Sequence, residues 1–419
     1  MNPPGGTRFG IFNDESIAFA KDPFSFVTQK RRRYGNIFQS RIIGRVTVFV
    51  TSNEGVREMM TEHSSCFRRG FMDHIHELYG EDSIIFSDEE DFGRLRTIIH
   101  SVVEPRRITE QNELIDAVIA MHLGKLNEQE SVPLYQTFKK MCTDLCLGLF
   151  LGMSLEDLKQ NSEKYSALVT AHWHGIVSVP LKFHIPGFGK STFRSAVEAR
   201  DKLLAEIYLR MDRADKSTLL HAINNAGFKS REEVAAHILL FISALVPKAL
   251  GSLLTSFCLE MAVDDHQWMC NKAIDDEEFL DRLLLEIQRK WPSFIGGRKI
   301  VTQELCISGF KVQEGQSLMY TTFTANRDPD VFPKPDSLLP DRWIGVNAGC
   351  EDRVWTFGGG PRGCVGKMLS QVLMKQSVTY LFKRYKWMRP NEQCFDIKWL
   401  PVSRPKENVV CIFRLKEMT

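Results

Sequence analysis

Phe357-Gly358-Gly359-Gly360-Pro361-Arg362-Gly363-Cys364-Val365-Gly366, near the C-terminal end of a chain of 419 residues, holds one cysteine in a glycine-rich loop. A cysteine binds a metal as its thiolate, and backbone N–H groups at a helix start or a nearby cation lower the pKa of the thiol. Cys364 is expected at such a helix start, and Arg362 supplies the cation two residues earlier. The loop therefore predicts a thiolate ligand for a metal, and heme iron is the metal that fits.

Four other residues of the loop have predicted roles beside the ligand. Gly360 lets the main chain turn sharply, and Gly366 lets the next helix lie close to a flat macrocycle. Arg362 is expected to reach a heme propionate, and Phe357 to shield the sulfur on its open side. The surroundings of a thiolate matter because burial and hydrogen bonding tune the potential of the iron.

The loop has two other interpretations. Gly358, Gly360 and Gly363 have the spacing of a dinucleotide-binding loop, G-x-G-x-x-G. That motif needs a preceding strand, a complete βαβ unit and an acidic residue about twenty positions later. No Asp or Glu occurs between Gly363 and Glu392, so the context is wrong. The other interpretation is a buried, inert cysteine beside an ordinary turn.

The loop resembles the cysteine-ligand signature of the cytochrome P450 family, F-x-x-G-x-x-x-C-x-G, with every fixed position present. Glu286 and Arg289 match the E-x-x-R of that family, and their spacing puts both side chains on one helical face. Pro340-Asp341-Arg342-Trp343 resembles the family's meander, so Arg342 would complete a triad with Glu286 and Arg289. The resemblance implies a scaffolding triad, heme b as cofactor, and a mainly α fold with a smaller β part.

Further heme contacts are implied by the resemblance. Arg96 falls where family members bind a propionate, whereas Phe92 stands where they usually have Trp or His and donates no hydrogen bond. Arg298 and Lys299 follow Gly296-Gly297 and are candidates for another propionate contact. The sequence does not choose between them. Val179-Pro180 through Arg200 resembles the retinoid and plant terpenoid or steroid branch of the family.

Composition gives broad limits. With 43% hydrophobic residues and no marked linker, residues 1–419 are expected to form one large domain, and the protein is expected to be a monomer. The balance of 54 basic and 52 acidic residues gives no sign of a nucleic-acid partner.

Ten irregularly spaced cysteines indicate a reduced, intracellular protein. Cys142 and Cys146 are expected to pack in a helix, and His172-Trp173-His174 is expected in a loop.

No signal peptide or membrane span is evident in the sequence. Pro3-Pro4-Gly5 resembles the hinge that follows a membrane anchor, so either the native protein is soluble or its anchor is absent here. The resemblance favours the second, with the native chain at the cytosolic face of the endoplasmic reticulum membrane. Phe183 to Phe188 would form either a membrane-contacting loop or a plain interhelical one. Lys367 is a candidate docking point for an acidic electron donor such as an NADPH-dependent reductase. Ile238 to Leu254 contains Pro247 and Lys248, which favours a buried helix.

The coarse secondary structure agrees with the implied fold. Ile37 to Ser40 and Arg45 to Val50 predict a β-hairpin, and further strands are expected near Lys299 to Val312 and at the C-terminus. The longest helix is expected to begin at Ser230, with Glu233 reciprocating its cap, and to end near Ala262. By the resemblance, its middle crosses the open face of the heme.

That middle departs from the family pattern. Family members usually carry A-G-x-D/E-T here, whose acid and threonine supply protons for dioxygen cleavage. Val246 replaces the acid and Pro247 replaces the threonine. The candidate catalytic segment is therefore Ala244, Leu245, Val246, Pro247 and Lys248. Lys248 would either face the pocket, as an acid or a carboxylate anchor, or extend toward solvent.

Three functions stay open at this point. The first is a monooxygenase that obtains protons from ordered water or substrate, as the resemblance to sterol hydroxylases with a nearby proline implies. Alternatively, the heme performs redox-neutral or peroxide-dependent isomerisation, dehydration or cyclisation, by resemblance to prostacyclin synthase and allene oxide synthase. The third class is a heme-binding or ligand-carrying protein without turnover.

The substrate is expected to be a hydrophobic small molecule such as a terpenoid, steroid, retinoid or lipid. Expected pocket walls are Phe71 to Ile85, Phe241 to Val246, Ser293 to Ile295 and Thr321 to Phe323. The side chains singled out within these walls are His74, Phe241, Val246, Phe294, Ile295 and Phe323.

Overall fold

The computed structural model describes residues 1–5, 14–70, 74–185, 189–244, 246–345, 348–390 and 396–416. The chain divides into two compact units. Unit 1 comprises Met1–Phe71, Thr255–Cys364 and Glu392–Val409, and unit 2 comprises Met72–Leu254, Val365–Asn391 and Val410–Thr419. The single domain expected over residues 1–419 stays a prediction.

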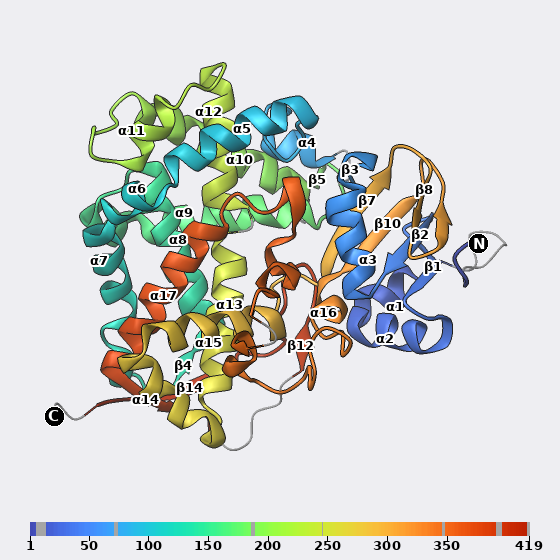
Figure 1. Ribbon diagram of the computed structural model, residues 1–419. Helices are drawn as coiled ribbons and strands as arrows, with labels where there is room; N and C mark the ends of the chain where they lie inside the picture. The colour runs from blue at the N-terminus through green and yellow to red at the C-terminus, as the bar shows by residue number, and fades with distance from the viewer. Residues whose placement is uncertain are drawn as a thin grey trace. The chain divides into compact units, whose positions relative to one another are not determined.

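Unit 1 is built on a five-stranded sheet of order β1-β2-β10-β7-β3 (Figure 1). Its strands are β1 (Ile37–Ile42), β2 (Arg45–Val50), β10 (Ser317–Thr321), β7 (Gly296–Val301) and β3 (Phe67–Arg69). The predicted hairpin is confirmed, because β1 and β2 pair antiparallel across a tight turn. Ile43 and Gly44 both have positive φ there, the backbone that a two-residue hairpin turn needs.

The two faces of this sheet carry separate hydrophobic clusters because side chains alternate along a strand. Val48, Val50 and Leu318 belong to one cluster, together with Trp355 from the glycine-rich region. Phe49 belongs to the other, with Phe38 and Phe323. The helices of unit 1 outside the central helix are α1 (Ser16–Lys21), α2 (Pro23–Tyr34), α3 (Asn53–Arg57), α14 (Gln267–Asp275), α15 (Glu277–Lys290) and α16 (Thr322–Ala325).

Short pairs of strands complete unit 1. β8 (Leu305–Ile307) pairs with β9 (Phe310–Val312), and β12 (Ile397–Lys398) pairs with β13 (Arg404–Pro405). The strands β7, β8 and β9 confirm those expected near Lys299 to Val312.

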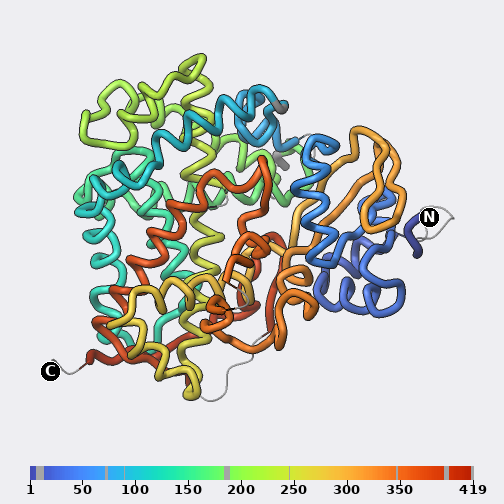
Figure 2. The backbone as a smooth tube through the Cα atoms, in the orientation of Figure 1, coloured from blue at the N-terminus to red at the C-terminus, as the bar shows by residue number. Residues whose placement is uncertain are grey.

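Unit 2 is mainly helical. Its helices are α4 (His74–Tyr79), α5 (Glu89–Val102), α6 (Pro105–Thr109), α7 (Asn112–Leu123), α8 (Leu134–Leu151), α9 (Leu155–Ile176), α10 (Thr192–Met211), α11 (Leu219–Asn224), α12 (Arg231–Ser243) and α17 (Lys367–Arg384). α8 packs against α7, α9 and α12, and α17 lies beside α7 (Figure 2). Unit 2 also has a three-stranded sheet of order β11-β14-β4. Its strands are β11 (Tyr385–Met388), β14 (Val410–Leu415), which is the expected C-terminal strand, and β4 (Val132–Pro133).

Two sequence predictions for unit 2 were wrong. His172, Trp173 and His174 lie within α9, not in a loop, because α9 is capped at Ser154 and continues to Ile176. The capping box expected at the start of the central helix is incomplete. Ser230 accepts a hydrogen bond from the amide of Glu233, but the Glu233 carboxylate accepts from the amide of Lys229 and from Arg94 instead.

The central helix is not continuous. α12 ends at Ser243, and α13 (Val246–Met261) follows after an interruption. Among the described residues, Arg231–Met261 is the one helical stretch long and apolar enough to cross a membrane, and 88% of its apolar window is buried inside the protein. This burial agrees with the core helix predicted from Pro247 and Lys248.

Candidate functional site

The glycine-rich loop holds Cys364 by hydrogen bonds within the loop. The Cys364 amide donates to the Phe357 carbonyl at 2.8 Å, and the Gly363 amide donates to the Gly360 carbonyl at 3.1 Å. Gly360 has a φ of +61°, and a Cβ atom there would lie 1.9 Å from the carbonyl oxygen of Met60. Only glycine fits this position. Gly366 precedes the first residue of α17, so Cys364 lies just before a helix start, as predicted.

Three basic side chains of unit 1 gather near Cys364. Arg69 on β3 pairs across the sheet with Lys299 on β7, so both side chains lie on the same face. Burial lowers the pKa of Lys299 to about 8, with Arg69 and Arg362 adding repulsion. Burial, then Arg362, lowers the pKa of Arg69 to about 10, and the charges of Tyr320 and Cys364 act in the opposite direction. These five electrostatic effects place Arg362, Tyr320 and Cys364 within electrostatic range of Arg69, and Arg69 and Arg362 within range of Lys299.

The strand register puts Arg298 and Lys299 on opposite faces of the sheet. Neighbouring residues of a strand point to opposite faces, so Arg298 points away from Arg69. Its Nε donates to Ser317 Oγ at 2.7 Å, and its pKa is lowered by burial and by Arg45. Lys299 is therefore the residue of the pair on the same face as Arg69, and the contact of Arg298 or Lys299 with a propionate stays a prediction.

Arg69 was missed by the sequence prediction. The run Cys66-Phe67-Arg68-Arg69 carries a weak signal, because alternation buries Phe67 and sends Arg69 to the same face. Nothing in the sequence, however, pairs this short strand with β7. Arg96 and Phe92 lie on α5 in unit 2, one helical turn apart, with Phe92 buried and Arg96 half-buried. Their contact with a heme stays a prediction.

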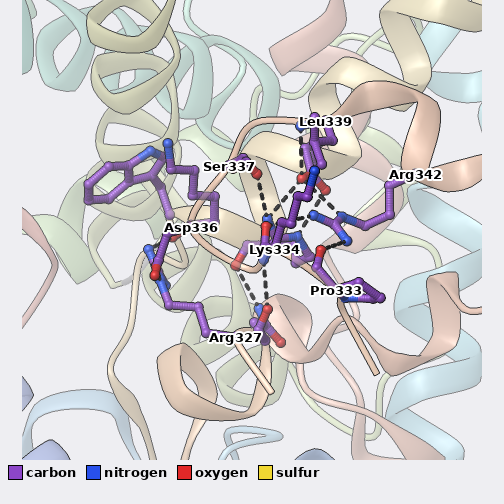
Figure 3. Close-up of polar contacts among 12 residues, drawn as sticks. Arg327, Pro333, Lys334, Asp336, Ser337, Leu339 and Arg342 are labelled. Atoms are coloured by element: carbon purple, nitrogen blue, oxygen red, sulfur yellow. Dashed lines mark hydrogen bonds and ion pairs between the residues drawn. The ribbon is translucent and has the colours of Figure 1, made fainter. Parts of the chain in front are cut away.

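The structure brings the predicted triad together in the interior of unit 1. Figure 3 shows Arg342 and Leu339 among these polar contacts. Arg289 donates to the Glu286 carboxylate from Nε at 2.9 Å and from Nη2 at 2.8 Å, and Arg342 Nε donates to Oε1 at 3.2 Å. Arg289 also donates to the carbonyl of Asn326 at 2.9 Å, and the amide of Leu339 donates to Glu286 at 3.1 Å. The Glu286–Arg289 pair thus connects α15 with two segments that are distant in the sequence, at Asn326 and at Leu339.

The candidate catalytic segment lies at the interruption of the central helix in unit 2. Ala244 has a φ of −81° and a ψ of −115°, outside the helical region, and Leu245 lies outside the described residues. Val246 begins α13 and is half-buried, and Pro247 is its second residue. Proline is tolerated in a first turn, whereas its ring would clash with a carbonyl in the interior of a continuous helix.

Lys248 does not extend to solvent. Lys248 is 4% exposed. Its Nζ lies 3.4 Å from the Ser243 carbonyl oxygen and 5.0 Å from the centre of the Trp173 ring. Burial and the charge of Lys139 lower the pKa of Lys248 to about 7, and Cys146 acts in the opposite direction. The solvent-directed alternative is therefore wrong.

The family model for cytochrome P450 matches residues 3–237 and 259–412. The chain belongs to the cytochrome P450 family. The residues skipped by the match, 238–258, contain the interruption between α12 and α13. The departure from the family pattern that begins with Val246 and Pro247 thus coincides with the gap in the match.

Relatives of this cytochrome P450 cover almost the whole chain. It is 25% identical to the putative cytochrome P450 120 of Synechocystis sp., over 97% of this chain and 95% of that protein. It is 22% identical to the beta-amyrin 28-monooxygenase of Barbarea vulgaris, over 95% of this chain and 90% of that protein. A solved structure titled "Retinoic acid bound cyanobacterial CYP120A1" has a TM-score of 0.86 at 22% identity, covering 99% of this chain and all of that one (100%). This likeness shows the fold.

As a cytochrome P450, the protein is a monooxygenase-type oxidoreductase that holds heme iron and takes a small-molecule substrate and a redox partner. The residues of unit 1 fit this cofactor. Cys364 is exposed, as is Cys306, whereas Cys66 and Cys258 are buried. The cations of Arg69, Lys299 and Arg362 match the two carboxylates that a heme carries.

The residues expected around the substrate divide between the units. In unit 2, Phe241 packs against Phe150 with ring centres 4.9 Å apart, and the ring of His74 meets Phe193 edge-on. In unit 1, Ile295 and Phe323 are buried in the cluster around Phe49, and Phe294 is half-buried. Phe71 lies outside the described residues.

Proposed function

We propose that this cytochrome P450 binds heme b through Cys364 and oxidises a hydrophobic small molecule of the terpenoid, steroid or lipid class. The observation that carries the proposal is the group of Arg69, Lys299 and Arg362 beside Cys364. Heme, when bound, supplies the oxidising chemistry of the family. Cys364 would bind the iron as its thiolate, and the three cations would hold the propionates.

The substrate class is supported by the names of relatives. They include the beta-amyrin 28-monooxygenase and an abscisic acid 8'-hydroxylase of Solanum lycopersicum, which is 22% identical over 92% of this chain and 85% of that protein. Both names describe oxidation of a hydrophobic molecule. Apolar residues at the pocket positions, such as Phe241 and Phe294, suit such a ligand.

The proton supply differs from the family pattern. Val246 and Pro247 carry no exchangeable side-chain proton. The nearest hydroxyl in sequence, Ser243 Oγ, is buried and engaged with the carbonyl of Leu239 at 2.6 Å and with His172 at 2.8 Å. Protons for an oxygenation would therefore come from ordered water or from the substrate.

The same observation favours a second candidate function. Val246 and Pro247, which carry no proton donor, suit redox-neutral or peroxide-dependent isomerisation, dehydration or cyclisation of a lipophilic substrate. A heme-binding protein without turnover is the third candidate. These three functions predict different results from one experiment.

The experiment incubates the purified holoprotein with candidate lipids under two conditions, in air with NADPH and a reductase, and anaerobically without reductant. Product only in air supports oxygenation, product without reductant supports redox-neutral chemistry, and a spectral shift without product supports a carrier. Cys364→Ala is the control for the ligand. Loss of the red-shifted absorption band of the ferrous carbon monoxide complex is expected, and an unchanged band would contradict the assignment.

The proposal includes attachment to a membrane surface, at the cytosolic face of the endoplasmic reticulum, as a monomer. Support comes from four exposed apolar side chains that follow α9, namely Val177, Val179, Leu181 and Phe183. Replacing Val179 and Leu181 with Ser is expected to reduce co-sedimentation with phospholipid vesicles. Equal co-sedimentation of the variant and the parent protein would remove this part of the proposal.

A further inference from the structure

Pro247 leaves one carbonyl of the central helix without its usual donor. In an α-helix, the N–H of residue 247 would bond to the carbonyl oxygen of residue 243, four positions earlier. Proline has no N–H, so this bond of a continuous helix cannot form at Ser243. Ser243 is fully buried, so bulk water does not replace the donor. A buried carbonyl without a partner is costly.

We infer that the side chain of Lys248 supplies the hydrogen bond that Pro247 removes, and thereby holds the interrupted conformation of the central helix. Lys248 Nζ donates to the Ser243 carbonyl at 3.4 Å. The donor comes from the residue next to the proline and reaches back along the chain. Lys248 is in this sense a positioning residue, which acts through the backbone of Ser243.

The surroundings of Lys248 suit a donor better than a charge. The titratable groups that face it are Lys139 and Cys146 on α8 and His172 on α9, and none of them is a carboxylate. Among the described residues, Lys248 forms no ion pair with Asp or Glu, and its nearest ring is that of Trp173. A buried lysine amine stays a hydrogen-bond donor when it loses its proton, and the neutral form costs less to bury.

The side chain of Ser243 is held as firmly as its carbonyl. Ser243 Oγ lies 2.6 Å from the Leu239 carbonyl and 2.8 Å from His172 Nδ1. His172 Nε2 lies 2.9 Å from the Leu78 carbonyl, which only accepts, so Nε2 carries the ring proton of the neutral imidazole. The single hydroxyl proton of Ser243 then goes either to the Leu239 carbonyl or to His172 Nδ1. Burial lowers the pKa of His172 to about 3, which keeps the ring neutral.

Ser243, the last residue of α12, is therefore held in place through both its carbonyl and its hydroxyl. Its carbonyl is bound by Lys248, its hydroxyl by α9 or by the preceding turn, and the next residue, Ala244, leaves the helix. The position of α13 after the interruption depends on this anchor. This inference concerns the shape of the helix and does not depend on which reaction the protein catalyses.

The test is a double-mutant cycle on the full-length holoprotein with Lys248→Met, Pro247→Ala and both together. Methionine matches the length of lysine and has no N–H, and alanine restores the backbone donor at position 247. Lys248→Met is expected to lower the folding equilibrium constant roughly ten- to a hundredfold more in the parent protein than in the Pro247→Ala background, because an unsatisfied buried group costs on that order. The readout is urea unfolding followed by circular dichroism and heme absorbance.

The coupling, and not either single effect, decides the inference. Removing a buried amine also relieves its burial cost, and this relief is the same in both backgrounds and cancels. Equal effects of Lys248→Met in the two backgrounds would overturn the inference. If Lys248→Met alone does not fold, recovery of the folded holoprotein in the double variant supports it, and failure of both variants contradicts it.

Discussion

Arg289 forms two parallel hydrogen bonds with the carboxylate of Glu286, and both side chains are fully buried. A guanidinium matches a carboxylate in this two-point geometry, which a lysine ammonium does not. Arg289 also holds the carbonyl of Asn326, so one side chain joins α15 to the segment that follows α16. The pair is therefore a structural element of unit 1, in agreement with the scaffolding role implied by the resemblance.

Replacing Arg289 with Lys is expected to destabilise the protein by about 3 kcal/mol, since breaking a buried ion pair leaves a charge incompletely bonded. Arg57→Lys is the matched control. Arg57 and Glu54 have the same i,i+3 spacing, but their side chains are 32% and 52% exposed, so the change is expected to cost less than about 1 kcal/mol. Urea unfolding of the two variants measures the difference, and similar costs would contradict the prediction.

Three glycines of the glycine-rich loop are predicted to differ in how well they tolerate replacement by alanine. Gly360→Ala places a Cβ atom 1.9 Å from the Met60 carbonyl oxygen at a φ of +61°, so the loop must move. Gly358→Ala has a similar φ of +68° but no atom nearer than 3.9 Å, and Gly363→Ala has ordinary φ with its nearest contact at 3.4 Å. Heme content after purification is expected to fall most for Gly360→Ala, less for Gly358→Ala and least for Gly363→Ala. Any other order would show that the loop is not held against Met60 as described.

Local patterns in the sequence predicted the parts of the site that depend on short spacings. The glycine-rich loop, the Glu286–Arg289 pair and the hairpin of β1 and β2 each depend on residues within about ten positions of one another. Arg342 was found because the meander motif accompanies the E-x-x-R motif in the resemblance.

The remaining parts depend on long-range pairing. Arg69 reaches the site because β3 pairs with β7, which lies more than two hundred residues later in the chain, and the same register turns Lys299 toward it. His172 was misplaced because a run of two histidines and a tryptophan carries no helical signal of its own. The direction of Lys248 could not be predicted, because a change of one residue rotates a side chain by about a hundred degrees around a helix.

Arg69 gives a prediction for heme retention. Arg69→Ala is expected to speed the loss of heme to a heme-scavenging protein, because one cation of the propionate site is removed. The heme-free protein is expected to lose little stability, since Arg69 is repelled by Arg362 and itself repels Lys299. Arg298→Ala is the control, because Arg298 lies on the opposite face of the same sheet. Faster heme loss from the Arg298 variant than from the Arg69 variant would reverse our assignment of the two faces.

Lys248 makes the stability of the protein depend on pH. Its pKa is about 7 in the folded protein, because burial and Lys139 disfavour its charge, against 10.5 ordinarily. Between these two values the unfolded chain binds more protons than the folded one. The contribution of Lys248 to stability therefore rises as the pH increases from 7 to about 10, and is constant below 7.

The measurement is the free energy of unfolding of the parent protein and of Lys248→Met at several pH values. Other groups titrate in the same range, Lys299 among them with a pKa of about 8, so the quantity of interest is the difference between the two proteins. That difference is expected to shift in favour of the parent protein as the pH rises from 7 to 10. A constant difference would mean that Lys248 keeps an ordinary pKa, and so that its amine is hydrated and not held against the Ser243 carbonyl.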